Sequence, residues 1–255
     1  LLILLSLNVF SHPYTPCDEE TGMADMYPCH KIDLLTRVHF EHMGGTISSS
    51  GSDIWGWTDP ETGKEYALMT IDTGTSFIDI STPTEPIYIG FLPTATFSSI
   101  WRDVKTYQNY AYIVSEANDH GMQVFNLNQI RDVTNPPVQF TSSNRFTGFG
   151  NAHNIVINEE TGYAYAVGAQ TCDGGLHMMS LADPGNPTFA GCYRTDGYTH
   201  DAQCVIYTGP DTEHNGKEIC FNANEDTVTI VDVTTKVSSV LISRTGYSNS
   251  QYTHQ

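Results

Sequence analysis

From residue 51 onward, hydrophobic and polar residues alternate in short runs, which is the pattern of half-buried β-strands. One arrangement recurs: a β-rich run, a polar loop that usually contains glycine, and an apolar run that ends in Asp, Asn or Ser plus an aliphatic residue. The four copies begin at Glu65, Ala111, Ala164 and Glu218. The 3.6-residue periodicity of amphipathic solenoid helices is absent. The pattern therefore predicts an all-β protein made of repeated units.

The spacing of the copies identifies the type of repeat. Intervals of 46, 53 and 55 residues separate the members of one aligned column: Tyr66, Tyr112, Tyr165 and Cys220. Periods of this size, with four short strands in each unit, are typical of β-propeller blades. The sequences DPETG and NEETG precede two of the units and are expected to form hairpin turns between first and second strands. We predict a β-propeller of four-stranded antiparallel blades over residues 51–255.

The aligned first strands place certain side chains in register. One column runs Ile54, Arg102, His153, His200 and His254, and the next runs Trp55, Asp103, Asn154, Asp201 and Gln255. These columns contain four blades and the start of a fifth. Because a closed ring generally needs more than four blades, we expect the ring to be incomplete in this fragment and to gain at least two more blades in the full-length protein.

Long motifs carry a resemblance to a known family: DIWGWTDPETG, AHNIVINEETGYAYAVG, GGLHMMSLADPGNPTFAGC, YTHDAQCVIYTGPD and EICFNANEDTVTIVDV. The chain resembles the choice-of-anchor B family, whose blades are LVIVD-type repeats, over nearly everything from Cys17 to the last residue. The resemblance implies an exported β-propeller that bacteria display through various C-terminal anchors. It implies no particular reaction.

Charge narrows the choice of partners. The chain has 11 Lys and Arg against 29 Asp and Glu, a formal net charge of -18. Such a surface repels phosphate backbones and anionic headgroups, which argues against nucleic acid and anionic membranes as partners. The negative charge is consistent with high solubility, with binding of cations or with basic partners.

The N-terminal sequence indicates export. Residues 1–11 form an apolar run too short to cross a bilayer and are expected to be the remnant of a signal peptide. Residues 12–50 are expected to form an N-terminal hook closed by a disulfide, followed by a linker. The short amphipathic stretch at 30–43 is the only place where we expect helix. The protein is therefore predicted to be secreted or displayed at the cell surface, with no transmembrane segment in this fragment.

The six cysteines lack CxxC spacing, so disulfides are a better interpretation than metal ligation, which stays the minor alternative. If residues 206 and 218 pair across a hairpin, Cys204 and Cys220 are also opposite each other. Cys172 and Cys192 fall at the ends of strands on one face of their blade, which leaves Cys17 with Cys29.

Candidate chemistry gathers where the first strands begin. The topology places the histidine column on the same face as acidic loops, and three imidazoles with a carboxylate suit zinc, whereas calcium would prefer the loop carboxylates. Arg102 argues against a symmetric ring of metal ligands. We therefore predict a partial metal site formed by His153, His200 and Asp201, with His254 as an additional ligand. The alternative is a metal-free polar mouth of capping and turn residues that repeat with the blade.

Other motifs carry less weight. The sequence around Asp72 mimics an aspartic-protease loop but has no second copy, so Asp72 is expected to be a turn residue. Trp55, Trp57 and Trp101 are expected to pack between blades.

Two classes of function follow. The first is a non-catalytic exported propeller that binds a protein, glycan or matrix partner. The second is a metal-dependent hydrolase with its site at the channel mouth. The first is favoured because the sequence contains no nucleophile elbow, no HExxH and no Asp-x-Asp run.

Overall fold

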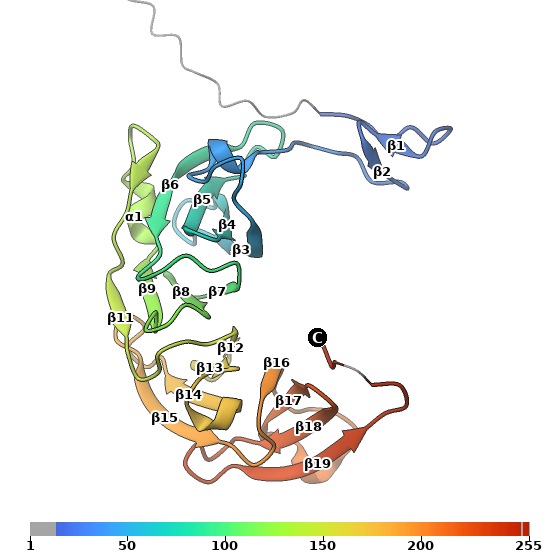
Figure 1. Ribbon diagram of the computed structural model, residues 1–255, viewed down its shortest axis with the longest axis vertical. Coiled ribbons are helices and arrows are strands. Elements are labelled where there is room, and N and C mark those ends of the chain that lie inside the picture. The colour runs from blue at the N-terminus through green and yellow to red at the C-terminus, as the bar shows by residue number, and fades with distance from the viewer. Residues whose placement is uncertain (1–13, 251, 255) are drawn as a thin grey trace, which may run out of the picture. The chain divides into compact units, whose positions relative to one another are not determined.

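The computed structural model describes residues 14–250 and 252–254, so the expected signal-peptide remnant at residues 1–11 and Gln255 lie outside the described part (Figure 1). Two compact units are present. The first contains the described residues up to Pro93 together with Ile130–Phe140, and the second contains Thr94–Gln129 and the described residues from Thr141 onward. Both units are built from β-sheets in which every pair of strands is antiparallel except β10 with β6, which confirms the all-β class.

The first unit begins with a small hairpin, β1 (Met23–Ala24) and β2 (Tyr27–Pro28), which the Cys17–Cys29 disulfide closes. After the 3-10 turn η1 (Phe40–His42), the chain enters the main sheet of this unit. In that sheet the strand order is β10-β6-β5-β4-β3. The strands are β3 (Gly51–Thr58), β4 (Glu65–Ile71), β5 (Gly74–Asp79), β6 (Ile87–Pro93) and β10 (Val138–Gln139).

Local sequence explains most of this sheet. The DPETG sequence forms the turn between β3 and β4, where the Gly63 amide donates to the Asp59 carbonyl oxygen at 2.8 Å. Asp72 lies in the tight turn between β4 and β5, as expected for a turn residue. Trp57 is buried and stacks on Tyr66 directly across the β3–β4 pair, with ring centroids 5.5 Å apart. Trp57 therefore packs within its own sheet, and the predicted packing between blades stays a prediction.

The second unit contains three four-stranded antiparallel sheets. The second and third are simple meanders, whereas in the first the chain leaves the sheet between β9 and β11 to form β10. The first has β7 (Arg102–Tyr107), β8 (Tyr110–Ser115), β9 (Met122–Asn126) and β11 (Asn144–Phe146). The second has β12 (Asn154–Asn158), β13 (Tyr163–Val167), β14 (Leu176–Ser180) and β15 (Thr188–Tyr193). The third has β16 (Thr199–Ile206), β17 (Glu218–Asn224), β18 (Thr227–Asp232) and β19 (Val240–Gly246).

These sheets match the repeats read from the sequence, with the aligned Tyr and Cys column on the second strand of each sheet. Residues 252–254 are not in a strand, although the Thr253 amide donates to the Asn224 carbonyl oxygen at 3.2 Å. Four-stranded antiparallel sheets are therefore observed. Their arrangement as propeller blades is a proposal rather than an observation.

Two hydrophobic cores separate the three sheets of the second unit. Strand β12 contacts both β7 and β16, and its successive residues face opposite cores because strand side chains alternate. Ile155 joins the core shared with the first sheet, and Val156 joins the core shared with the third. In β13, likewise, Ala164 faces one core and Tyr165 the other. Both faces of the central sheet are thus buried.

Helix is nearly absent from the described residues, as predicted. The 30–43 stretch contains only the turn η1, whereas the single α-helix described is α1 (Asn128–Arg131), a turn in the long loop after β9. The Asn126 side chain starts this turn by accepting a hydrogen bond from the Asn128 amide at 3.0 Å, and Ile130 is buried in it. A local cap and one buried residue decided the position, which hydrophobic periodicity does not detect. No helix in the described part is long and apolar enough to cross a membrane.

All three predicted disulfides are present: Cys17–Cys29, Cys172–Cys192 and Cys204–Cys220. The predicted register is also correct, since Ile206 pairs with Glu218 and Cys204 with Cys220, whose Cα atoms are 4.0 Å apart.

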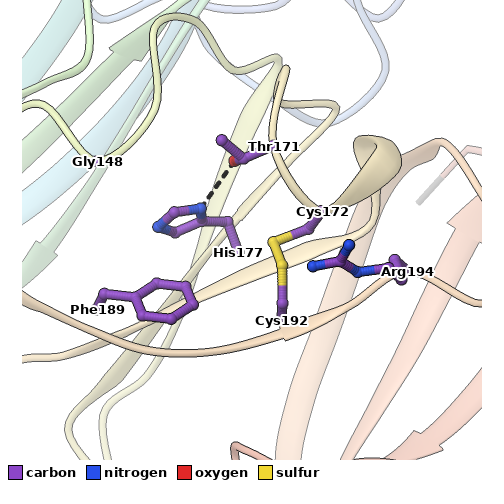
Figure 2. Close-up of a pocket in the computed structure, with 7 residues that line it drawn as sticks. All are labelled: Gly148, Thr171, Cys172, His177, Phe189, Cys192 and Arg194. Carbon is purple, nitrogen blue, oxygen red and sulfur yellow. Dashed lines mark hydrogen bonds between the residues drawn. A yellow bond between two sulfur atoms is a disulfide. The ribbon is translucent and has the colours of Figure 1, made fainter.

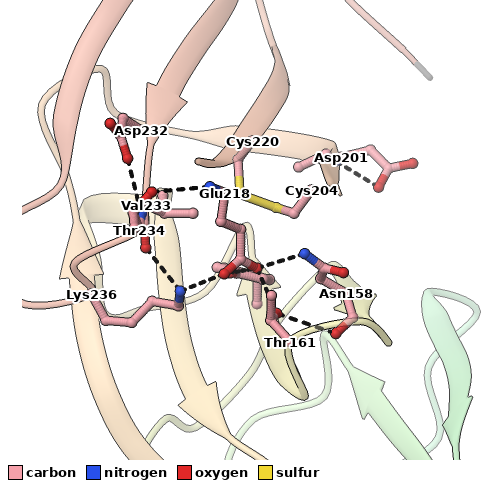
Figure 3. The surroundings of a disulfide bond; sticks show 12 residues. Asn158, Thr161, Asp201, Cys204, Glu218, Cys220, Asp232, Val233, Thr234 and Lys236 are labelled. Atoms are coloured by element: carbon pink, nitrogen blue, oxygen red, sulfur yellow. Dashed lines mark hydrogen bonds and ion pairs between the residues drawn. A yellow bond between two sulfur atoms is a disulfide. The ribbon is translucent and has the colours of Figure 1, made fainter. Parts of the chain in front are cut away.

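Near the Cys204–Cys220 disulfide, Glu218 forms a buried polar cluster (Figure 3). Its Oε1 atom accepts hydrogen bonds from Asn158 Nδ2 and Thr161 Oγ1, both at 2.8 Å, and from the Tyr165 hydroxyl at 2.5 Å. Its Oε2 atom pairs with Lys236 Nζ at 2.7 Å. This cluster joins the β12–β13 turn to the third sheet.

Candidate functional site

Three of the four predicted site residues come together in the second unit. His153 immediately precedes β12, His200 lies in β16, and His254 follows β19. The ring centroids of His153 and His200 are 4.4 Å apart, and those of His200 and His254 are also 4.4 Å apart. The contact between β12 and β16 brings the first two together although 47 residues separate them. We call these three residues the histidine cluster.

A carboxylate orients the first imidazole. Glu116, in the loop after β8, lies 2.5 Å through its Oε1 atom from Nδ1 of His153. A carboxylate only accepts, so Nδ1 carries the proton and Nε2 of a neutral His153 has a free lone pair. That Nε2 lies 2.7 Å from Nε2 of His200, which therefore donates its N–H to His153. Glu116, His153 and His200 form a directional hydrogen-bonded chain.

His200 is the buried member of the cluster, with 6% of its surface exposed. Burial, followed by the neighbouring charges of His153 and His254, lowers the pKa of His200 to about 4. It is therefore neutral at physiological pH. Its Nδ1 atom is buried and makes no hydrogen bond with any described residue. One polar atom at the centre of the cluster is thus available to a ligand.

Asp201, the fourth predicted site residue, is next to His200, but its Oδ1 atom accepts a hydrogen bond from the adjacent Ala202 amide at 2.8 Å. Burial raises the pKa of its carboxyl group. The equivalent residues of its column join neighbouring first strands: Asp103 accepts from the Ile155 amide at 2.8 Å, and Asn154 donates to the His200 carbonyl oxygen at 3.2 Å. At Asp103 and Asn154, this column therefore has a structural role, because its side chains hydrogen-bond to the backbone of the next first strand.

The acidic loop residues predicted to share this face behave differently from one another. Glu116 reaches the histidine cluster, whereas Asp226 pairs with Arg244 at 3.3 Å. Arg102, the predicted obstacle to a symmetric metal ring, is buried and donates to Thr94 Oγ1 at 2.8 Å.

Aromatic rings surround the cluster. Trp101 and Tyr198 lie 5.9 Å and 6.5 Å from the His153 ring, and Tyr252 lies 4.9 Å from the His200 ring. Trp101 is 53% exposed and Tyr252 is 47% exposed, so both present open ring surface. Blade-to-blade packing was predicted for Trp101, but this exposure is better suited to contact with a ligand. We call Trp101, Tyr198 and Tyr252 the aromatic rim.

A repeated signal in the sequence could have found two members of this rim. The tripeptide Tyr-Thr-His occurs at Tyr198 and again at Tyr252, so each tyrosine is placed two residues before a histidine of the cluster. In an extended chain, side chains two residues apart lie on the same face.

A ready-made set of metal ligands is found elsewhere. Among the described residues, the group of three His, Cys, Asp or Glu side chains whose ligand atoms lie within 4.8 Å of one another is Asp211, Glu213 and His214, in the loop between β16 and β17. This group is largely exposed and acidic, and carries no further mark of a site. In the histidine cluster the neighbouring rings are tilted against one another, and His153 and His200 are hydrogen-bonded.

The geometry suits recognition of a polar partner with an apolar face, since the neutral imidazole of His200 is flanked by open aromatic surface. No protein-family model matches this chain, and no curated protein matches it.

Proposed function

We propose that this chain is part of an exported β-propeller that acts as a non-catalytic binding module outside the cell or at its surface. The binding surface consists of the histidine cluster and the aromatic rim, and its partner is a protein or a glycan. The observation that carries the proposal is the exposed aromatic rim around a buried, neutral His200.

The propeller is supported by the second unit. Its three four-stranded sheets place their first strands next to one another, because β12 contacts both β7 and β16 (Figure 1). Hydrophobic cores lie between successive sheets, as they do between blades. Further blades following the same rule would continue the series around an axis beside these first strands.

Export is supported by the disulfides. All six cysteines are paired, and disulfides persist in oxidising compartments, whereas cytosolic reductants keep thiols reduced. The net charge of -18 gives high solubility in such an environment and disfavours anionic partners.

The histidine cluster supports binding by neutral polar contacts. His200 supplies an unpaired buried Nδ1, His254 is exposed, and Trp101 and Tyr252 offer ring faces. Aromatic faces stack on the apolar faces of sugar rings and on peptide side chains, while imidazoles make the polar contacts that fix orientation.

A binding screen tests this proposal. The full-length protein is applied to glycan and extracellular-matrix protein arrays beside its Trp101→Ala and Tyr252→Ala variants. The matched control is Trp55→Ala, which removes a 39% exposed tryptophan of the first unit. We expect a specific partner whose signal falls roughly tenfold or more in the two rim variants and is unchanged in the control. Equal loss in all three variants, or no specific partner at all, contradicts the proposal.

A second candidate is a metal-dependent hydrolase at the same place, and the Glu116–His153 hydrogen bond favours it. A carboxylate that holds Nδ1–H of a histidine is the usual support of an imidazole that binds metal through Nε2. Nε2 of His153 and of His200 would be the first ligands, with His254 and Asp201 as the predicted additional ones, and zinc as the ion that best suits imidazole.

Metal content separates the two candidates. The full-length protein is purified without chelator and analysed for zinc and calcium beside a His153→Ala, His200→Ala double variant. Stoichiometric metal that is lost in the double variant supports the hydrolase candidate. Equal metal content in both proteins removes it.

A further inference from the structure

A pocket of about 420 Å³ lies in the second unit beside the Cys172–Cys192 disulfide (Figure 2). Its volume is within the range of small-molecule sites. No residue of the histidine cluster or the aromatic rim lines it. The lining residues are Gly148, Thr171, Cys172, His177, Phe189, Cys192 and Arg194.

His177, in β14, provides the polar end of this pocket. Only 2% of its surface is exposed, and its Nδ1 atom lies 2.8 Å from the Thr171 hydroxyl. Its Nε2 atom is buried and makes no hydrogen bond with any described residue. Figure 2 shows this atom on the side of the ring that faces away from Thr171. Leaving a buried polar atom unsatisfied is unfavourable, so a ligand that hydrogen-bonds to Nε2 is favoured over one that does not.

Aromatic rings enclose the imidazole. The His177 ring makes edge-on contacts with three phenylalanine rings, whose centroids are 5.8 Å (Phe146), 5.2 Å (Phe149) and 5.0 Å (Phe189) away. Burial lowers the pKa of His177 to about 4, so the imidazole is neutral at physiological pH. Phe189 is 59% exposed although it is large and apolar. The pocket wall therefore offers an aromatic face and a neutral hydrogen-bonding group.

Arg194, at the end of β15, provides the charged side of the pocket. It is exposed and forms no ion pair with any described residue, in a chain where 29 acidic residues outnumber 11 basic ones. Figure 2 shows its guanidinium group turned toward the disulfide. An unpaired guanidinium beside a pocket is suited to a carboxylate, which it can bind through two parallel hydrogen bonds.

We propose that this pocket binds small hydroxyaromatic carboxylates. The carboxylate pairs with Arg194, the ring packs against Phe189 and the disulfide, and the hydroxyl group bonds to Nε2 of His177. A phenolic hydroxyl both donates and accepts, so it satisfies His177 in either tautomer. The pocket shares no residue with the proposed binding surface, so a failure of one proposal leaves the other unaffected.

Calorimetric titration of the full-length protein tests the proposal with four probes of one shape. They are 4-hydroxyphenylacetate, phenylacetate without the hydroxyl, 4-hydroxyphenylacetamide without the charge, and tyramine with the opposite charge. We expect the hydroxylated carboxylate to bind most tightly. Phenylacetate and the amide should each bind roughly tenfold more weakly, and tyramine should not bind.

Variants locate the site. Arg194→Gln should weaken the binding of 4-hydroxyphenylacetate roughly tenfold or more and leave the binding of the amide unchanged. Phe189→Ala should weaken the binding of both probes. Lys217→Gln is the matched control, because it removes the same charge outside the pocket. The proposal is overturned if no probe binds saturably, if tyramine binds as tightly as the carboxylate, or if Arg194→Gln and Lys217→Gln have equal effects.

Discussion

The buried pair of Lys236 and Glu218 permits a sharp test of how the second and third sheets of the second unit are held together. Only 8% of the Lys236 side chain and 4% of the Glu218 side chain are exposed, and Nζ also donates to the Val233 carbonyl oxygen at 2.8 Å. The ammonium group lies 4.0 Å from the centroid of the Tyr163 ring. We therefore choose Lys236→Met, which removes the charge and largely keeps the volume of the side chain.

The expected loss of unfolding free energy follows from the contacts that Glu218 keeps in the variant. Without Lys236, the Glu218 carboxylate stays buried with three neutral donors and no cation. Removing one partner of a buried pair typically costs about 3–5 kcal/mol of unfolding free energy. The neighbouring Lys217 pairs with Asp232 at 3.5 Å and is 37% exposed, so Lys217→Met should cost about 0–1 kcal/mol. The two substitutions are chemically identical and differ in burial.

Urea unfolding, followed by circular dichroism and tryptophan fluorescence, measures both losses. With a slope near the upper end of the usual range, about 3 kcal/mol per M, Lys236→Met should lower the urea midpoint by about 1–1.7 M. Lys217→Met should lower it by less than about 0.3 M. A double variant, Glu218→Gln with Lys236→Met, keeps a neutral acceptor for the three donors and should recover part of the loss. If Lys236→Met loses no more than Lys217→Met, the buried pair does not stabilise the fold as argued.

Two further predictions concern pH. The Arg131 guanidinium binds the fully buried Asp59 through two hydrogen bonds and holds the pKa of that carboxyl group far below its usual value. The stabilisation from this pair is present above pH 4 and is lost as pH falls further. The urea midpoints of the wild type and Arg131→Met should therefore differ at pH 7 and converge toward pH 2. A difference in midpoint that is the same at every pH would count against the pairing. Burial lowers the pKa values of His120, His177 and His200 to about 4 each, so unfolding takes up protons and stability should fall as pH decreases from 6.5 to 4. Thermal unfolding between pH 7 and 4 measures this decrease, and a midpoint that is flat over that range would contradict it.

The sequence by itself determined the local features of this protein. Alternation of apolar residues gave the strands, and turn sequences such as DPETG placed hairpins between first and second strands. Because an antiparallel register fixes every opposite pair once one pair is known, the Cys204–Cys220 disulfide could be predicted from strand spacing alone. The alignment of repeats likewise placed His153, His200 and His254 in one column, and the structure brings their rings together.

Features that depend on packing between distant segments came only from the tertiary structure. Strand β10 pairs in parallel with β6 through residues 48 positions apart, and no local pattern marks it. Glu116 reaches His153 across 37 residues, and Trp101 is exposed beside the same ring instead of packed between sheets. The unpaired Nε2 atom of His177 likewise results from burial of this side chain among the assembled sheets, and the local sequence gives no sign of it. The hydrophobic periodicity of a strand predicts which of its faces is buried. It does not predict which side chain of another sheet contacts that face, because this contact depends on how the sheets pack.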